Sequence, residues 1–292
     1  MAHTIAIINQ KGGVAKTIST AHLAVALSKL KKNILCIDLD PQANLSQILG
    51  NIGEGEKPAT TIYDALQKDS TQSIHLTYRD TKHDNVKLCY GSLRMSTFEL
   101  DIQGNLDPSR VLTNKIDQGC HDDFDFILLD CPPSLSAITT NALCASDFFI
   151  IPIAAGDSLA LEGVEQLTTV VNSVRSAVNE KLMLLGVVLT KYDGRLNIAK
   201  AIAEEATRVF GTASMFKARI SQGTLLEQAT HQRKTVYEVD TRAPAAKDHT
   251  KLAKEIITRA EFYSSIASDE NTPDEATDEG TPEEEPNISI VA

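Results

Sequence analysis

A chain of 292 residues with 42% apolar residues can bury the core of one large α/β domain or of two small ones. It contains no run of 18 apolar residues and no basic leader before an apolar stretch, which argues against a membrane-spanning or exported protein and predicts a cytosolic one. Its five cysteines are scattered without a C-x-x-C pair, so neither a disulfide framework nor a zinc or iron–sulfur site is indicated.

The net charge of −11 is distributed unevenly along the chain. Nine acidic residues and no Lys or Arg lie from Asp269 onward, so residues 1–268 carry a net charge of only −2. Between Arg175 and Arg259, fifteen Lys or Arg residues face nine Asp or Glu residues. We therefore expect one globular domain at residues 1–267, with a basic C-terminal third, and an acidic, disordered tail at residues 268–292.

The sequence NQKGGVAKT at residues 9–17 follows an apolar strand pattern at 4–8 and precedes a helical pattern at 17–32. Backbone N–H groups of such a glycine turn, together with a helix N-terminus, form a cradle for phosphate. The usual Walker A pattern fails because Gln10 and Ala15 occupy its glycine positions, but a deviant form with an extra lysine, Lys11, fits. Ala15 is tolerable at this position if its backbone is near helical, since only a positive φ would demand glycine. The predicted nucleotide-binding residues are Lys11, Gly12, Gly13, Val14, Ala15, Lys16, Thr17 and Ile18.

Within this loop, Lys16 is predicted to lie along the β- and γ-phosphates, and the Thr17 hydroxyl to ligate Mg²⁺. The strand predicted at 33–38 ends in the sequence DLDPQ. Asp38 and Asp40 share a face of an extended segment and lie at the strand end where parallel sheets bind ligands. One carboxylate would orient Mg²⁺ through water while the other orients or deprotonates the attacking water. The alternative for either one is a turn or helix cap.

The middle of the chain is less informative. We expect a loop at 51–60, a short helix at 61–68, a strand at 86–90 and helices at 96–102 and 108–118. His75, His83 and His121 are interpreted as exposed polar residues rather than metal ligands. The apolar strand at 124–130 ends in Asp130 and is typical of a Walker B element, whose carboxylate holds Mg²⁺ through water. Residues 131–136 should form a mobile loop beside the γ-phosphate.

The last half continues the strand–helix alternation. Strands are predicted at 148–153, 181–190 and 214–220, and helices from near residue 158, up to 210, at 224–231 and at 244–265. Strand–helix–strand units of this length imply right-handed crossovers and parallel strands. The fold class is therefore α/β, a single domain with a mostly parallel sheet and helices on both faces, as in P-loop NTPases of the deviant Walker type.

Three motifs, KGGVAKT at 11–17, DLDPQ at 38–42 and DCPPS at 130–134, together closely resemble the ParA/Soj family of deviant-Walker ATPases. The resemblance continues through ALEG at 160–163 and TKYDGR at 190–195, and so covers most of residues 1–265. It implies an ATP-bound homodimer in which Lys11 reaches the ATP of the partner subunit. The implied catalytic residues are Lys11, Lys16 and Asp40, and the residues implied at Mg²⁺ are Thr17, Asp38, Asp40 and Asp130.

Family members are slow ATPases that bind nonspecific DNA and release it when a ParB-like partner stimulates hydrolysis, distributing plasmids or chromosomes over the nucleoid. The basic C-terminal third is what such binding requires, because Lys and Arg at phosphates supply sequence-independent affinity. Arg195 matches a family position associated with DNA contact, but Gln222 and Leu225 stand where chromosomal members carry basic residues. The DNA-contact candidates are Arg195, Lys217, Arg219, Arg233 and Lys234.

Three alternatives stay open at this point. The same motor could position a protein array or microcompartment instead of DNA, and only the partner protein would distinguish the two. A membrane-surface ATPase like MinD would need a basic amphipathic C-terminal helix, and the acidic tail argues against it. A metallocluster carrier would need cysteines paired across a dimer axis, for which Cys131 is the sole candidate.

Overall fold

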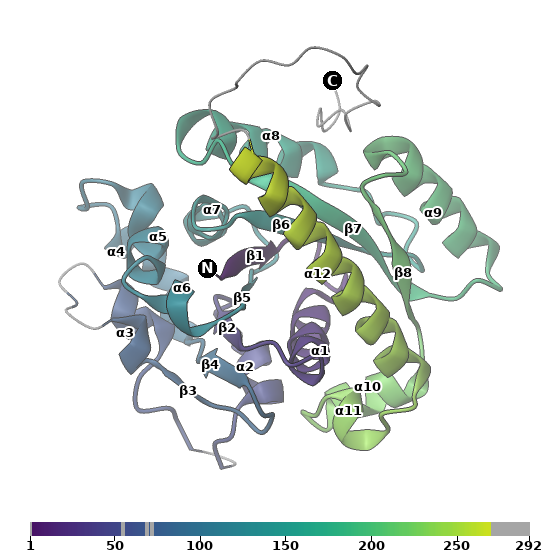
Figure 1. Ribbon diagram of the computed structural model, residues 1–292, viewed down its shortest axis with the longest axis horizontal. Helices are drawn as coiled ribbons and strands as arrows, with labels where there is room; N and C mark the ends of the chain where they lie inside the picture. Colours follow the sequence, from purple (N-terminus) through teal and green to yellow (C-terminus); the bar gives the residue numbers. More distant parts are fainter. Residues whose placement is uncertain (1, 54–55, 68–69, 71–72, 270–292) are drawn as a thin grey trace.

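The computed structural model describes residues 2–53, 56–67, 70 and 73–269, and its centre is an eight-stranded sheet (Figure 1). The strand order is β3-β4-β2-β5-β1-β6-β7-β8, and every pair is parallel except β3 with β4. This confirms the α/β fold class. The strands are β1 (His3–Ile7), β2 (Ile34–Asp38), β3 (Tyr78–Asp80), β4 (Val86–Cys89), β5 (Phe126–Asp130), β6 (Phe148–Ala154), β7 (Met183–Tyr192) and β8 (Met215–Ser221).

Helices cover both faces of the sheet, because successive strand residues point to opposite sides. In β1, Ile5 and Ile7 pack in the core of one face, whereas Ala6 and the following Ile8 pack in the other. The first face carries α1 (Lys16–Lys29), α2 (Asn44–Leu49), α10 (Thr224–His231), α11 (Val236–Val239) and α12 (Pro244–Asp269). The second carries α3 (Ile62–Leu66), α4 (Phe98–Asp101), α5 (Val111–Ile116), α6 (Cys120–Asp123), α7 (Ala137–Cys144), α8 (Val164–Ala177) and α9 (Asn197–Phe210). Short 3₁₀ helices lie at Ile74–Leu76, Leu93–Thr97 and Pro108–Arg110.

The edge strand β8 is protected by carboxylates of α12, which crosses the first face in Figure 1. Glu255 accepts hydrogen bonds from the backbone N–H groups of Lys217 (2.8 Å) and Ala218 (2.7 Å). Asp248 accepts from the hydroxyl of Ser221 at 2.5 Å and from its N–H at 3.2 Å. An unpaired strand edge is a template for aggregation, so α12 stabilises the sheet by occupying those donors.

Two predictions about elements are wrong. The helix expected near Ser158 begins at Val164, because the preceding segment forms turns that pack against the P-loop. Gly163 has φ +82° there, a backbone conformation that favours glycine, and a Cβ atom on it would lie 2.7 Å from Oε1 of Gln10 and displace that side chain. The three histidines at 75, 83 and 121 are half-buried beside carboxylates rather than exposed.

The C-terminal helix α12 runs to Asp269, so it passes the boundary expected at 267. Most of the predicted disordered tail, residues 270–292, lies outside the described residues. All five cysteines are buried as free thiols. Within the described ranges, none of the helices is long and apolar enough to cross a bilayer.

Candidate functional site

Hydrogen bonds made by the side chains of Asn9 and Lys16 fix the backbone of the P-loop. It lies between β1 and α1, at the carboxyl ends of the parallel strands. Asn9 donates through Nδ2 to the carbonyl of Pro152 (2.8 Å) and accepts through Oδ1 from the N–H of Lys11 (2.9 Å). Lys16 is buried, and its ammonium donates to the carbonyls of Asn9 (2.8 Å) and Lys11 (3.0 Å). The loop therefore holds a buried cation beside its backbone, with one ammonium donor left for a ligand.

The near-helical backbone that would make Ala15 tolerable is not present in the structure. The Ala15 backbone is left-handed, with φ 68° and ψ 32°, rather than near helical. The Ala15 carbonyl accepts the N–H of Ser19 in the first turn of α1 (2.8 Å), so the helix begins directly from this left-handed residue. For an L-residue the left-handed region costs about 1–2 kcal/mol. The loop therefore stores strain at the phosphate cradle, where the usual Walker A pattern has glycine.

The extra lysine of the loop, Lys11, is engaged within its own subunit. Its Nζ lies 2.8 Å from Oδ2 of Asp157, in the loop after β6. The hydrogen bond from Lys11 is the first cause that lowers the pKa of Asp157. Asp157 was not predicted, although it lies three residues beyond the end of β6, at the same end of the sheet as Asp38 and Asp130. Any role for Lys11 in a second subunit requires this ion pair to open.

The structure brings the two strand-end aspartates together. Asp38 and Asp130 are register partners on β2 and β5, and Ile7 of β1 pairs with Asp130 on its other side. Oδ1 of Asp130 accepts from the hydroxyl of Thr20 at 3.3 Å, but Oδ2 is buried with no hydrogen-bond partner among the described residues. Burial, followed by the charge of Asp38, raises the pKa of Asp130 well above its usual value. A buried carboxylate in this state is under-satisfied and would be stabilised by a cation.

These residues fit a magnesium ion that is held mostly by water and phosphate. Mg²⁺ is bound by oxygen atoms and usually keeps several waters, using only one or two protein ligands. Asp130 has an orphaned oxygen, and Thr17 follows Lys16 in the first turn of α1. No cluster of three or more His, Cys, Asp or Glu residues able to hold a metal alone occurs in the described part of the chain. The donor set therefore suits an ion shared with a nucleotide rather than a protein-only site.

Asp38 is held by α2, a helix that the sequence did not predict. Its Oδ2 accepts hydrogen bonds from the N–H (2.8 Å) and hydroxyl (2.6 Å) of Ser46, and its Oδ1 accepts from the N–H of Asp40 (3.3 Å). Burial raises the pKa of Asp38 to about 7, and the Ser46 hydrogen bonds oppose that rise. Gly91 lies against the same carboxyl, since a Cβ atom there would be 2.8 Å from its Cγ. Ser46 and Gly91 are thus positioning residues that sequence reasoning missed.

Asp40 and the loop after Asp130 complete this end of the sheet. Asp40 is largely buried, and its Oδ1 accepts from the N–H of Gln42 at 2.9 Å, which fixes the turn into α2. Cys131 is fully buried, and burial raises the pKa of its thiol. In the following loop the hydroxyls of Ser134 and Ser136 lie 3.1 Å apart. The cysteine therefore presents no thiolate at the surface, while Asp40 remains beside the buried aspartates.

The five DNA-contact candidates fall into two groups. Arg195, Lys217 and Arg219 lie on or beside β7 and β8, and all are exposed. Arg195 is fully solvent-facing but pairs with both oxygens of Asp193 (2.7–3.2 Å), lowering the pKa of that carboxyl to about 2. Arg219 stacks on the Tyr192 ring at 4.6 Å and donates to its hydroxyl at 2.6 Å. The second group, Arg233 and Lys234, lies in the turn between α10 and α11 beside α2.

Known proteins resemble this chain over most of its length. Residues 2–184 match the model of a family described as an AAA domain. The sporulation initiation inhibitor protein Soj of Bacillus subtilis (strain 168) is 32% identical over 88% of this chain and 98% of its own. The chromosome-partitioning ATPase Soj of Treponema pallidum (strain Nichols) is 33% identical over 89% of this chain and 98% of its own.

Solved structures share the same fold. The cell division ATPase MinD of Pyrococcus furiosus superposes with a TM-score of 0.68 at 26% identity, covering 88% of this chain and 99% of MinD. Cobyrinic acid a,c-diamide synthase of Mycobacterium smegmatis, with bound ADP and magnesium, superposes with a TM-score of 0.74 at 24% identity, covering 89% and 96% of the two chains. At these identities the second likeness concerns the fold alone.

Proposed function

The chain belongs to the ParA/Soj family of partition ATPases, and we propose that it hydrolyses MgATP to switch between a free form and a dimer bound to nonspecific DNA. The observation that carries this proposal is the buried set formed by Lys16, Asp38 and Asp130 beneath a loop that also bears Lys11. A partner of the ParB type would stimulate hydrolysis and release the DNA. The cycle would distribute plasmid or chromosome DNA over the nucleoid.

The roles of the site residues follow from their positions. Lys16 would neutralise the β- and γ-phosphates with the ammonium donor that the loop carbonyls leave free. Thr17, and Asp130 through water, would hold Mg²⁺, which supplies charge neutralisation at the transferred phosphoryl group. Asp40 would orient the attacking water, whereas Asp38 is occupied by Ser46 and would fix the geometry of α2. Phosphoryl transfer needs chiefly such positioning and electrostatic stabilisation.

Exposed apolar side chains support a dimer that closes over the nucleotide. Leu159, Leu196 and Leu225 follow β6, β7 and β8, respectively. All three therefore lie toward the end of the sheet where the parallel strands have their carboxyl ends, which is also where the P-loop lies. They are 52%, 45% and 37% exposed. Apolar residues gathered at one edge are typical of a protein-protein contact. A second subunit packed on this edge would bury them and would receive Lys11 once it leaves Asp157.

Exposed cations support DNA binding, in two patches. Arg195, Lys217 and Arg219 form one beside β8, and Arg233 and Lys234 form part of the other. Each phosphate contact made by such a residue steepens the salt dependence of binding by about one unit in a log–log plot. Because Asp193 neutralises Arg195, a DNA phosphate must compete with that carboxylate. We therefore expect Lys217 and Arg219 to contribute at least as much as Arg195.

The direct test titrates purified protein onto random-sequence duplex DNA at low salt, with ATP, with ADP and without nucleotide. Binding that requires ATP, and that weakens in Lys217→Glu/Arg219→Glu with a shallower salt slope, supports the proposal. Lys31→Glu/Lys181→Glu is a matched control because it makes the same charge change at two exposed residues outside both patches. Equal DNA binding with and without ATP, or none at low salt, would refute the DNA arm.

A membrane-surface function has one observation in its favour. Phe262 and Ile266 are exposed on the last turns of α12, at 58% and 43%, with the spacing of one helix face. The acidic residues that follow Asp269 in the sequence would be repelled by anionic lipid, which favours the DNA function. Co-sedimentation with anionic vesicles in the presence of ATP separates the two. The identity of a partner protein encoded beside this one would show whether the cargo is DNA or protein.

A further inference from the structure

A cavity of about 670 Å³ lies between α2 and the α10–α11 turn, apart from the P-loop. Its walls are α2 with the preceding Ala43, the end of β4 at Tyr90 and Gly91, and residues 231–234. Of the residues that the structure describes, none from 9 to 18 lines it. Its volume is within the range of sites that bind nucleotide-sized molecules. The cavity is therefore a candidate ligand site separate from the one already described.

Cations converge on this cavity from two distant parts of the chain. Lys82 reaches it from the segment between β3 and β4, and Arg233 and Lys234 reach it from the α10–α11 turn, with His231 beside them. Among the described residues lining it, Glu56 is the single carboxylate. Among these described lining residues, three Lys or Arg side chains outnumber one carboxylate, and that excess of positive charge favours an anion.

The turn that carries these cations is fixed to α2. The Lys82 ammonium donates to the carbonyl of Ile48 in α2 (3.2 Å) and to the carbonyl of Arg233 (3.3 Å). The N–H of Lys234 donates to the carbonyl of Ala229 at 2.9 Å. Arg233 has a left-handed backbone, with φ 54°, which is costly for a residue other than glycine. The cations are thus held at the mouth of the cavity by backbone contacts.

The remaining lining suits the organic part of such an anion. The Tyr90 hydroxyl accepts the N–H of Asn51 at 3.0 Å and retains its own proton for donation. Side-chain amides of Asn51 and Gln47 add further hydrogen-bonding groups, and Ile52 and Pro58 supply apolar surface. Small-molecule sites typically combine a partly apolar wall with a few polar groups that converge on the ligand.

One wall of the cavity is formed by residues that hold Asp38, which together with Asp130 forms the aspartate centre. Ser46 lines the cavity and also donates twice to Asp38. Gly91 lines it as well, and its N–H donates to the Ser46 hydroxyl oxygen at 2.8 Å. A molecule in the cavity would therefore contact the residues that hold Asp38.

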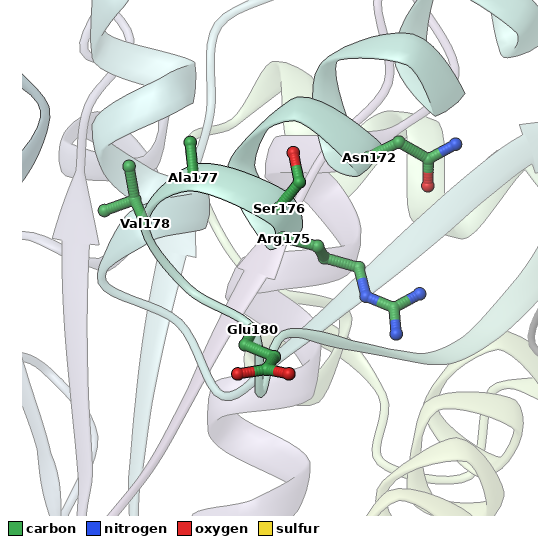
Figure 2. A pocket seen from close by; sticks show the side chains of 6 residues that line it. All are labelled: Asn172, Arg175, Ser176, Ala177, Val178 and Glu180. Atoms are coloured by element: carbon green, nitrogen blue, oxygen red, sulfur yellow. The ribbon is translucent and has the colours of Figure 1, made fainter.

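We propose that this cavity is an accessory binding site for a small organic phosphate of nucleotide size. The proposal does not rest on ATP hydrolysis at the P-loop, but it gives Arg233 and Lys234 a role other than the DNA contact considered above. The cavity of about 520 Å³ at the end of α8 offers a contrast. Figure 2 shows its two charged side chains, Arg175 on the helix and Glu180 on the loop that follows. Because this second cavity carries one charge of each sign, it does not attract an anion as strongly as the first.

The test uses the full chain with Lys16→Ala, which suppresses nucleotide binding at the P-loop. The probe is mant-AMP, followed by fluorescence anisotropy at low salt. We expect saturable binding in Lys16→Ala and a loss of roughly tenfold or more in affinity when Arg233→Glu and Lys234→Glu are added. The control adds Lys181→Glu and Lys254→Glu, which make the same charge change at exposed residues outside the cavity. That control should bind as Lys16→Ala does.

Two outcomes overturn the proposal. One is the absence of mant-AMP binding in Lys16→Ala, and the other is an equal loss in the cavity variant and in its control. If random duplex DNA binds through Arg233 and Lys234 while mant-AMP does not, these cations belong to the DNA surface instead. Thermal melting of each variant checks folding, and Arg233→Gln/Lys234→Gln replaces the glutamate pair if that pair unfolds, with a smaller expected loss.

Discussion

Acid should destabilise this protein through a pair of buried histidines between α1 and α12. The rings of His22 and His249 are fully buried and stack with centroids 4.8 Å apart. His22 Nε2 accepts the N–H of Val236 at 2.9 Å, so its proton is on Nδ1, which donates to the carbonyl of Ile18 at 2.7 Å. His249 donates in the same way to Ala245 (2.7 Å), and its Nε2 has no partner among the described residues. Both rings are therefore built to be neutral.

The sign and size of the effect follow from the pKa values. Burial lowers the pKa of His22 to about 3, helped by the proximity of His249, and lowers that of His249 to about 4. An unfolded histidine has a pKa of about 6.5. Because the folded values are lower, the stabilisation is complete above that pH and is lost as the pH falls toward the folded values. Between pH 7.5 and 5, each histidine lowers the free energy of unfolding by about 2 kcal/mol, which is a large share of a typical folding free energy.

The wild-type pH curve alone does not isolate this effect, because Asp38 acts in the opposite direction. Its pKa is raised to about 7, so its contribution grows as the pH falls from 7.5 to 5. The comparison therefore uses variants. Urea unfolding followed by circular dichroism at both pH values should show that His249→Gln loses about 2 kcal/mol less than wild type on acidification. His231→Gln, at an exposed position on α10, is the control. Identical pH dependence in wild type and His249→Gln would refute the reasoning.

The remaining predictions concern the P-loop and its neighbours. Lys16→Ala should abolish ATP binding, whereas Asp40→Ala should retain it and trap a dimer in gel filtration; a monomeric Asp40→Ala with ATP would contradict the role of Asp40. Asp157→Asn frees Lys11 and should strengthen ATP-dependent dimerisation several-fold in sedimentation velocity, while Lys11→Ala should bind nucleotide without dimerising; an unchanged dimer fraction in both would exclude the cross-subunit role. Ala15→Gly should change the free energy of unfolding by about 0–1 kcal/mol in the stabilising direction and keep ATP binding, because relief of the left-handed backbone offsets the entropy of glycine. Ala15→Val should lose both stability and ATP binding in calorimetric measurements, and tolerance of valine would show that this backbone conformation is not needed.

Local sequence patterns predicted the chemistry of the site because strand ends in a parallel sheet share one edge. An apolar run that stops at an aspartate places its carboxylate at that edge, whichever strand it belongs to. Asp38 and Asp130 are far apart in sequence, yet they became direct register partners. The same rule applies to Asp157, which follows the apolar run that contains β6. Lys11 was predicted as a cation, but its partner in the same subunit was not.

Contacts between distant segments could not be predicted from local patterns. Ser46 is an ordinary polar residue in a six-residue helix, and nothing in its neighbourhood indicates that it holds Asp38. Gly91 reads as a turn residue, whereas the structure requires glycine there because the Asp38 carboxyl lies against it. Lys82 gains its meaning only from the approach of the α10–α11 turn. In each case the decisive partner is set by packing of the two helical layers rather than by sequence spacing.

The backbone of Ala15 could have been predicted, and the reason applies to a second residue. The usual Walker A pattern places glycine at that position, and a position that favours glycine is one where φ is positive. Ala43, which precedes α2, has the same left-handed conformation, with φ 51°. Both helices that border the aspartate centre, α1 and α2, are therefore entered through an alanine in a costly conformation. Strain of this kind persists where the surroundings determine it, and here the hydrogen bonds of Lys16 and Ser46 do so. Lys16 and Ser46, which hold these two entrances, are also the residues that would contact the phosphate and that hold Asp38. A substitution that forbids the left-handed backbone, as Ala15→Val does, should therefore disturb the site, whereas glycine should leave it intact.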